Sequence, residues 1–229
     1  MNEPDAVAGR YARRSAVDDR YSPLRPEVQR LLQQRQRVLV DLMVRAGLGA
    51  VGGLRLTEVG CGSGGNLLEL LGLGFEPQHL QGIELLPERL ARARERLPAA
   101  LRLIAGDASV ADVPPGSQDL VLQSTVFSSL LDDAFQQRLA DAMWRWLKPG
   151  GAVIWYDFTV DNPRNRDVRG VPVTRIRGLF PQGVVTARRV TLAPPLARAA
   201  VRVHPLLHDA LNLLPLLRTH VLAWVAKPR

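Results

Sequence analysis

The sequence predicts an α/β protein in which helices flank both faces of a mostly parallel β-sheet. Short apolar runs alternate with segments of helical spacing from residue 54 to residue 158. This alternation is typical of a parallel sheet built with right-handed crossovers. In addition, a turn with glycines at alternate positions (Gly60, Gly62 and Gly64) joins the first apolar run to the helical segment that follows it.

Composition narrows the class of protein. The 229 residues, 46% of them hydrophobic, suffice for one large globular domain. No apolar run reaches the roughly 18 residues of a membrane helix, and the N-terminal residues lack a secretory leader. Cys61 is the single cysteine, which excludes an intrachain disulfide and a cysteine-based metal cluster. We therefore expect a cytoplasmic protein without a bound metal.

The net charge is +8 and the sequence pI is about 10.8. A net positive charge of this size is compatible with binding to nucleic acid, anionic lipid or an acidic substrate. It is equally compatible with arginines spread over a solvated surface that binds no partner. No block of five like charges is present, and the aromatic residues are not interleaved with the basic ones. Nucleic acid is therefore the disfavoured partner.

The first elements follow from apolar spacing. Residues 1–22 are polar with little pattern, so we expect an arm there. A helix is expected from Pro26 to about Gly47, where the glycine is a suitable C-cap. The segments that follow alternate between strand and helix. We expect strands at 54–60, 79–85, 101–107, 117–125 and 152–158, and helices at 66–73, 87–97 and 132–151, the last ended by Pro149 and two glycines.

The alternation stops after Phe158. Residues 159–172 have the composition of a loop, and two further strands are expected at 184–192 and 219–227. Between these strands, apolar residues at helical spacing predict a helical insertion at about 194–215. Pro205 should break or kink this insertion, because proline removes a helical hydrogen bond.

The glycine turn has the properties of a ligand-binding turn. Glycines accept positive φ and let a ligand approach the backbone, and the next helix directs its N-terminal N–H groups toward that ligand. The spacing departs from the dinucleotide fingerprint GxGxxG, and no lysine follows as a Walker loop requires. A purely structural turn remains an alternative.

Two acids end the next two strands. Glu84 lies 20 residues after Gly64 and is suited to a ribose diol, whereas Asp107 lies one strand further out and is suited to an adenine amino group. A capping acid and a turn aspartate are the alternatives. The glycine turn and the two acids would lie in a row along the carboxyl edge of the sheet, which favours a nucleoside-containing ligand.

At this point the chain resembles the class I S-adenosylmethionine-dependent methyltransferases over about residues 54–158. The matching segments are "TEVGCGSG", "GIEL", "AGDA", "QDLVLQSTVF" and "WLKPGGAVIWYDF", and the last two strands resemble the reversed hairpin of that family. The resemblance implies a Rossmann-like seven-stranded sheet of order 3-2-1-4-5-7-6 with strand 7 antiparallel. The segments "YDFTVDNPRNRDVRGV" and "PLLRTHVLAW" also resemble a bacterial subgroup linked with surface-polysaccharide or secondary-metabolite biosynthesis.

The resemblance also implies a cofactor, S-adenosylmethionine, a product, S-adenosylhomocysteine, and a division of the chain. Residues 1–47 would form an arm and a helix that cover the active site, and residues 48–229 the methyltransferase domain. The implied cofactor contacts are Glu58, Gly60, Cys61, Gly62 and Ser63 for the methionine portion, Glu84 and Leu85 for the ribose and adenine, Gly106, Asp107 and Ala108 for the adenine, and Gln123 and Ser124 beside the sulfonium.

The acceptor is less defined than the cofactor. We expect a small molecule or a saccharide methylated on a hydroxyl oxygen, for which Asp157 and His204 are candidate general bases. A loop-anchoring acid and a helix-boundary histidine are the alternatives for these two residues. The acceptor-site candidates are Tyr11 and Tyr21, which would close over the cofactor, and Arg164, Arg166 and Arg169, which would bind an anionic acceptor.

Other functions stay open at this point. RNA or another nucleic acid is an alternative acceptor, although residues 123–127 lack the Asn/Asp-Pro-Pro-aromatic signature of base-amino methylation. An NAD-dependent oxidoreductase and an inactive cofactor-binding protein are further alternatives. The protein is expected to be a monomer or a homodimer. The insertion at 194–215 has the pattern of a helix that packs on the sheet or contacts a membrane surface peripherally.

Overall fold

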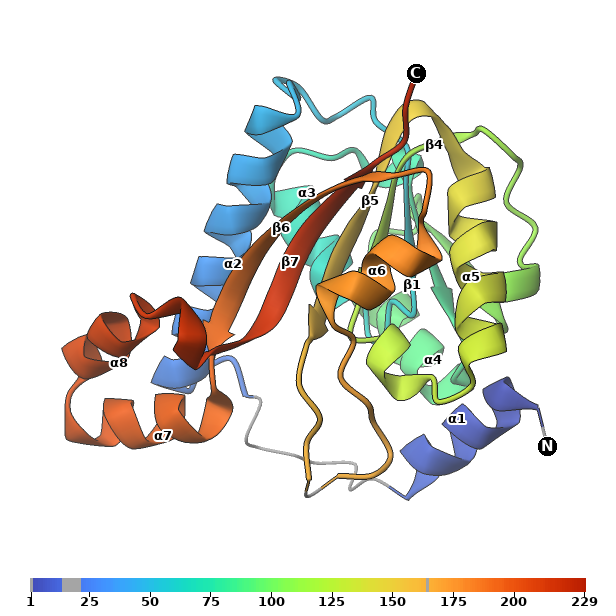
Figure 1. The fold of residues 1–229 in the computed structure, drawn as a ribbon. Coiled ribbons are helices and arrows are strands. Elements are labelled where there is room, and N and C mark those ends of the chain that lie inside the picture. The colour runs from blue at the N-terminus through green and yellow to red at the C-terminus, as the bar shows by residue number, and fades with distance from the viewer. Residues whose placement is uncertain (1, 14–21, 164) are drawn as a thin grey trace.

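The computed structural model describes residues 2–13, 22–163 and 165–229, and its centre is a seven-stranded sheet (Figure 1). The strand order is β3-β2-β1-β4-β5-β7-β6. Only β7 runs against its neighbours β5 and β6; the other pairings are parallel. This confirms the sheet order and the reversed strand implied by the sequence. The strands are β1 Leu56–Val59, β2 Leu80–Glu84, β3 Arg102–Ala105, β4 Gln118–Ser124, β5 Leu147–Phe158, β6 Val184–Leu192 and β7 Arg218–Ala226.

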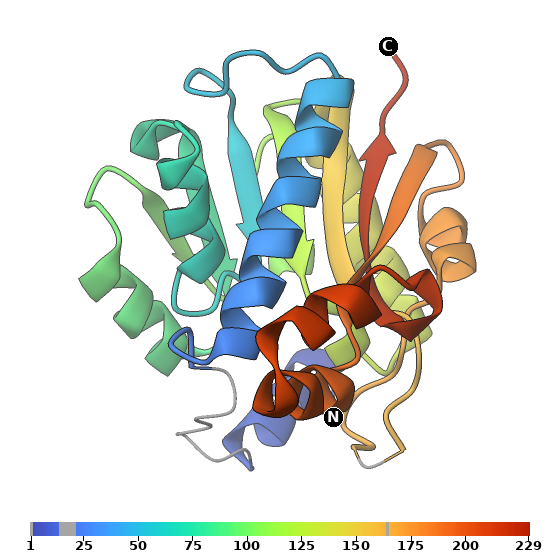
Figure 2. The same cartoon turned by 90° about the vertical axis from the view of Figure 1, so that its left-hand side faces the viewer.

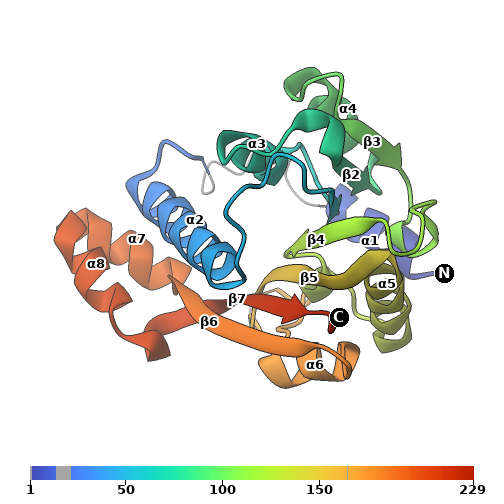
Figure 3. The same cartoon turned by 90° about the horizontal axis from the view of Figure 1, so that it is seen from above.

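Helices cover both faces of the sheet. Figure 3 shows α2, α3 and α4 on one side of the strands, and α5 and α6 on the other. The helices are α1 Glu3–Ala12, α2 Pro26–Arg45, α3 Gly65–Gly72, α4 Pro87–Arg96, α5 Asp133–Trp146, α6 Val173–Leu179, α7 Pro194–Val203 and α8 Pro205–Asn212, with short 3-10 turns η2 Pro77–His79, η3 Ala108–Val110, η4 Phe127–Ser129 and η5 Pro215–Leu217.

The core consists of two apolar layers separated by the sheet. Leu39 of α2, Leu67 of α3 and Ala93 of α4 pack in one layer with inward side chains of the strands. The other layer contains Phe135 of α5 and Trp155 of β5, and Trp155 is fully buried. Strand residues alternate between the layers, because successive side chains of a strand point to opposite faces.

The structure corrects two expectations. Residues 3–12 form helix α1 instead of part of an unpatterned arm, because Asn2 caps the helix by accepting a hydrogen bond from the Asp5 N–H at 3.0 Å. The helix expected at 132–151 ends at Trp146, and Leu147 already pairs with Gln118 of β4. The apolar spacing of residues 132–146 continues into Leu147, so the periodicity does not mark the helix end, whereas Pro149 already disfavours helical backbone at the residue before it.

Other expectations are confirmed. The helical segment after β6 breaks at Pro205 into α7 and α8, and His204 connects the two helices. These helices lie at the end of the sheet where the parallel strands terminate, and α1 lies at the same end (Figures 1 and 2). Within the described residues, no helix has both the length and the apolar character that crossing a bilayer requires.

Candidate functional site

The glycine turn follows β1 and precedes α3. Gly60, Gly62 and Gly64 have φ values of +64°, +56° and +80°. A Cβ atom on Gly60 would lie 2.6 Å from Cγ2 of Val126, and one on Gly64 would lie 2.7 Å from Cδ1 of Leu97. Larger residues are therefore excluded at these two positions by both backbone conformation and space.

Cys61, within the same turn, is a structural residue. Its side chain is buried, and its N–H donates to the carbonyl of Ile83 at 3.0 Å. Burial raises the pKa of the Cys61 thiol far above its ordinary value, with the carboxyl groups of Glu58 and Glu84 acting in the same direction. The thiol is therefore neutral and unsuited to nucleophilic chemistry.

Glu84 links the ends of β1 and β2. Its Oε2 accepts a hydrogen bond from the Gly62 N–H at 2.7 Å, and its Oε1 accepts one from the Leu86 N–H at 2.8 Å. A carboxylate has about four lone-pair directions, so two remain for a ligand. The same carboxyl group thus fixes the glycine turn, and it also lines a cavity at this edge of the sheet.

Asp107 holds the turn after β3. Its Oδ1 accepts from the Ser109 N–H at 2.8 Å, and its Oδ2 accepts from the Ser109 hydroxyl at 2.9 Å. Gly106 has a φ of +114°, and its N–H donates to the carbonyl of Glu84 at 2.9 Å. The two acids that end β2 and β3 are therefore held on adjacent turns of one sheet edge.

A cavity of about 700 Å³, including its open mouth, lies along this edge. Seven of the twelve predicted cofactor contacts line it. The five outside its wall are Glu58, Cys61, Gly62, Ser63 and Gln123. The seven are Gly60, Glu84, Leu85, Gly106, Asp107, Ala108 and Ser124.

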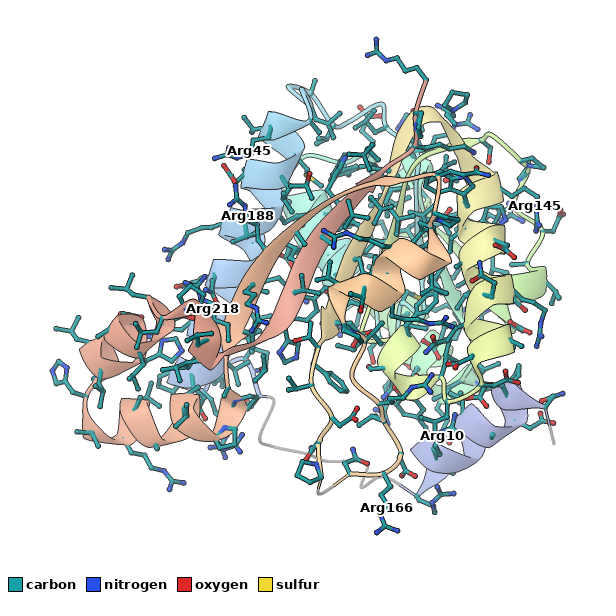
Figure 4. All side chains as sticks on the ribbon, viewed as in Figure 1. Arg10, Arg45, Arg145, Arg166, Arg188 and Arg218 are labelled. Atoms are coloured by element: carbon teal, nitrogen blue, oxygen red, sulfur yellow. The ribbon has the colours of Figure 1, made fainter. Side chains whose placement is uncertain are left out.

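Helix α1 covers this cavity with Val7 and Tyr11. Arg10 pairs with Glu3 at 2.5 Å and donates to the carbonyl of Ser129 at 2.9 Å, at the junction of α1 with the rest of the molecule (Figure 4). Glu3 also accepts from the N–H of Leu131 at 2.7 Å. The sequence predicted that this N-terminal segment and Tyr11 cover the active site, but it did not predict helix α1, although Asn2 before Glu3 and Asp5 is a helix-start signal.

The end of β4 has an unusual backbone. Thr125 has a φ of +57°, in the left-handed region that threonine rarely adopts. Its N–H donates to the carbonyl of Tyr156 at 2.8 Å. The buried Gln123 stabilises the following turn by accepting from the Val126 N–H at 3.1 Å. Backbone strain of this kind occurs at functional sites, and here it directs Ser124 into the cavity wall.

A second cavity, narrow and much smaller than the first, lies between α2, α3 and the sheet. Ser124, at the end of β4, is in the lining of both cavities. Arg35, Glu69 and Tyr156 are among the polar residues of its wall. Arg35 uses its Nη2 for both Glu69 Oε2 at 2.5 Å and Asn66 Oδ1 at 2.8 Å, which leaves Nε and Nη1 as further donors.

Glu58 lies next to this polar group. Its Oε1 accepts from Asn66 Nδ2 at 2.6 Å, but its Oε2 is buried and has no hydrogen-bond partner within the described part of the chain. Burial raises the pKa of Glu58 to about 8. An unpartnered buried oxygen is energetically unfavourable, and a donor from a bound ligand would satisfy it.

Sequence reasoning did not identify Arg35. A signal was present, because Arg35 lies four residues before Leu39 and seven before Leu42, within the buried stripe of α2. A charged residue in an apolar stripe needs a partner. The partners Asn66 and Glu69 are on another helix, and the sequence pattern does not reveal such pairing across helices.

The candidate general bases lie elsewhere. Asp157 is fully buried, and its two oxygens accept from the N–H groups of Ser128 and Phe158 at 3.1 Å and 3.0 Å. His204 is exposed and caps α8 by accepting from the Leu206 N–H at 3.2 Å. Neither residue lines either of the two cavities. Each of the two side chains therefore holds local backbone in place, which is a structural role.

The described arginines of the loop 159–172, Arg166 and Arg169, do not line either cavity. Arg169 pairs with Asp133, and its N–H donates to the carbonyl of Ser128 at 2.8 Å. Arg166 is exposed and points away from the body of the molecule (Figure 4). Arg164 and Tyr21 lie outside the described residues.

Comparison with known proteins places this geometry in a family. Residues 57–151 match the family model described as a methyltransferase domain. A trans-aconitate 2-methyltransferase of Afipia carboxidovorans is 31% identical over 160 residues, which cover 69% of this chain and 56% of that protein. The chain spans about half the length of the curated relatives it matches.

Solved structures agree on the fold. A structure of a putative sarcosine dimethylglycine methyltransferase from Galdieria sulphuraria is similar with a TM-score of 0.66 and 13% identity, over 88% of each chain. The [4+2]-cyclase SpnF is similar with a TM-score of 0.61 and 17% identity, over 84% of this chain and 81% of that one. The sheet order, the edge cavity and the domain match define a nucleoside-cofactor protein of the methyltransferase class.

The methyltransferase domain of this chain is of the class I S-adenosylmethionine-dependent type, a class whose cofactor is S-adenosylmethionine. The residues present fit this cofactor on structural grounds. Glu84 and Asp107 supply hydrogen-bond acceptors along the wall of one cavity. Glu58 lines neither cavity, so its contact with the cofactor stays a prediction.

We expect Glu84→Ala to weaken S-adenosylhomocysteine binding at least about tenfold, because hydrogen bonds to a charged group contribute roughly 1.5–3 kcal/mol. Titration calorimetry measures this affinity. Glu84→Gln, which keeps one acceptor oxygen, should have an intermediate effect. The exposed acid Glu88, on the first turn of α4, provides the control variant Glu88→Ala. Unchanged affinity in Glu84→Ala would show that the ribose binds elsewhere.

We also expect a pH-dependent contribution of Asp157 to stability. Burial raises its folded-state pKa from 3.8 to about 7. The folded state therefore holds this proton more tightly, and the stability it contributes is lost as the pH rises from about 4 to 7. Between pH 5 and pH 8 the wild type should lose about 1–3 kcal/mol of unfolding free energy relative to Asp157→Asn. Urea unfolding measures this difference, and a pH-independent difference would contradict the raised pKa.

Proposed function

We propose that the protein transfers the methyl group of S-adenosylmethionine to an oxygen of a small, carboxylate-bearing molecule. The observation that carries this proposal is that Ser124 is in the lining of both cavities. One cavity has the acceptors for an adenosyl group, and the other has Arg35 with two donors to spare. A methyl group carried to Ser124 would therefore lie between the cofactor and a cationic pocket.

In this proposal Glu84 binds the ribose hydroxyls and Asp107 the adenine amino group, as the family resemblance implies. The backbone of the glycine turn and Glu58 hold the methionine portion. Helix α1 closes the adenosyl cavity from above through Val7 and Tyr11, and Arg89 lies 4.3 Å from the centre of the Tyr11 ring. A closed, preorganised cavity excludes water and fixes the direction of the reacting bond.

When bound, S-adenosylmethionine supplies a sulfonium methyl group; the acceptor oxygen forms the new O–CH3 bond with its own electron pair as the S–CH3 bond breaks, leaving S-adenosylhomocysteine. The protein then has to hold the acceptor in line. Arg35 is suited to this role because a guanidinium binds carboxylates with paired donors. Its contacts with Glu69 and Asn66, and the Tyr156 ring 5.3 Å away, fix its orientation.

A carboxylate acceptor fits this site better than the hydroxyl acceptor expected from the sequence. A hydroxyl benefits from a general base, whereas a carboxylate is already deprotonated. Asp157 and His204, the two candidate bases, are bound to backbone groups outside both cavities. The relatives named trans-aconitate 2-methyltransferase support an acidic small molecule as well.

The alternatives have less support. The methyltransferase domain match disfavours an NAD-dependent oxidoreductase. The likeness to a [4+2]-cyclase shows that this fold also occurs in a protein whose name describes another reaction. The release of S-adenosylhomocysteine separates methyl transfer from such a reaction, because only methyl transfer consumes the cofactor.

The test is an acceptor screen that follows S-adenosylhomocysteine release. We expect turnover with a small di- or tricarboxylate, with trans-aconitate as the first compound, and none with monosaccharides or with the fully esterified acids. Turnover only with hydroxyl compounds would contradict the proposed acceptor. No turnover with any acid, in a protein that binds the cofactor, would contradict it as well.

Arg35→Gln should raise the KM for the accepted acid at least about tenfold, because a charge-assisted bond of roughly 1.5–3 kcal/mol is lost. Arg37→Gln, an exposed residue on the same helix, is the matched control. Cofactor affinity should change little in either variant. If Arg35→Gln instead weakened S-adenosylhomocysteine binding and left the KM for the acid unchanged, Arg35 would bind the methionine carboxylate, and the acceptor role would be wrong.

A further inference from the structure

The segment between β6 and β7, residues 194–217, contains α7, α8 and η5, and we call it the α7–α8 hairpin. An ordinary amphipathic helix buries its large apolar side chains, and this hairpin exposes them. Its buried side chains are small or polar, namely Ala197, Ala200 and His208. Its large apolar side chains are exposed, to 67% for Leu206 and 89% for Leu216. We call the exposed group the leucine patch. It consists of Leu196, Val203, Leu206, Leu207, Leu213, Leu214 and Leu216, seven of the thirteen exposed large apolar side chains in the described part of the chain.

Hydrogen bonds and an ion pair attach the hairpin to the rest of the fold, so the leucine patch has a fixed position. Arg218 donates to the carbonyl of Asn212 at 2.8 Å and to that of Arg189 at 2.9 Å, at the junction of the hairpin with the two last strands (Figure 4). Arg30 of α2 pairs with Asp209 of α8 at 3.2 Å. These contacts hold the inner side of the hairpin and leave its apolar side to solvent. A concentration of apolar surface of this kind marks an interaction site.

The charge around the leucine patch is positive. α7 carries Arg198 and Arg202, and Arg202 is exposed. The acid of the hairpin, Asp209, is neutralised by its pair with Arg30. The whole chain has a net charge of +8. Exposed leucines beside arginines are the combination that binds the surface of an anionic membrane, because the leucines enter the headgroup region and the arginines attract acidic headgroups.

We propose that the α7–α8 hairpin docks on an anionic lipid surface through the leucine patch. A second copy of this chain is the less suitable occupant, because a two-fold contact would bring Arg198 and Arg202 of both copies together. The hairpin also projects from the sheet, as Figure 1 shows, in a shape suited to shallow insertion. This inference does not depend on the identity of the methyl acceptor.

Docking would have a consequence for the site. The hairpin connects the end of β6 to the start of β7, and both lie at the sheet end where the parallel strands terminate (Figure 2). The cofactor cavity and α1 are at the same end. Binding through the leucine patch therefore brings the active-site end of the molecule to the lipid surface, where acidic amphiphiles are concentrated.

Co-sedimentation with vesicles tests the proposal. We expect the full chain to sediment with vesicles of equal parts phosphatidylglycerol and phosphatidylcholine, and at least about tenfold less with phosphatidylcholine alone. The double variant Leu206→Ser/Leu216→Ser should lose at least about tenfold in partitioning, because two large apolar side chains no longer insert. Arg198→Gln/Arg202→Gln should weaken binding to the anionic vesicles and reduce its dependence on salt.

The control is Val184→Ser, which removes an apolar side chain exposed to 64% at the start of β6, the opposite end of that strand from the hairpin. This variant should bind vesicles as the wild type does, and circular dichroism should show native folding for every variant.

Wild-type protein that stays in the supernatant would overturn the proposal. So would a leucine variant that binds as well as the wild type, which would leave general basicity as the cause. A dimer by light scattering that Leu206→Ser/Leu216→Ser converts to a monomer, without vesicle binding, would assign the patch to a second copy.

Discussion

The hydrogen bond from the Gly62 N–H to the Glu84 carboxylate connects the two strands on which the cofactor site is built. It joins the turn after β1 to the end of β2, and Gly106 then joins the ends of β2 and β3 by donating to the carbonyl of Glu84. The carboxylates that we propose bind a sugar and a base therefore have fixed positions before a ligand arrives. Such preorganisation reduces the ordering that binding requires.

The position of Ser124 follows from the same construction. β4 lies next to β1 in the middle of the sheet, and its last residue lines both the adenosyl cavity and the Arg35 pocket. The strained backbone of Thr125 and the buried Gln123 fix this turn. Helix α1 then closes the adenosyl side through the Arg10 and Glu3 contacts. The insertion between β6 and β7 adds the leucine patch at the same end.

Local patterns predicted the sheet and the cofactor edge well. Each glycine and each edge acid follows its own apolar run, so Gly60, Glu84 and Asp107 could be placed from the chain alone. Helix α1 was missed because its side chains are largely polar, and its stability comes from a cap and from contacts with residues near position 130. Arg35 was missed because its partners are on another helix. The exposure of the leucine patch was equally hidden, since helical spacing predicts an apolar face but not whether another element covers it.

The most direct test of this account is calorimetric titration of the wild-type chain with S-adenosylhomocysteine and, separately, with NAD. The account predicts one saturable site for S-adenosylhomocysteine and no detectable binding of NAD, because the carboxyl edge offers acceptors for one ribose and one adenine. A folded sample that binds neither compound, or that binds only NAD, would contradict the central assignment of this sheet edge.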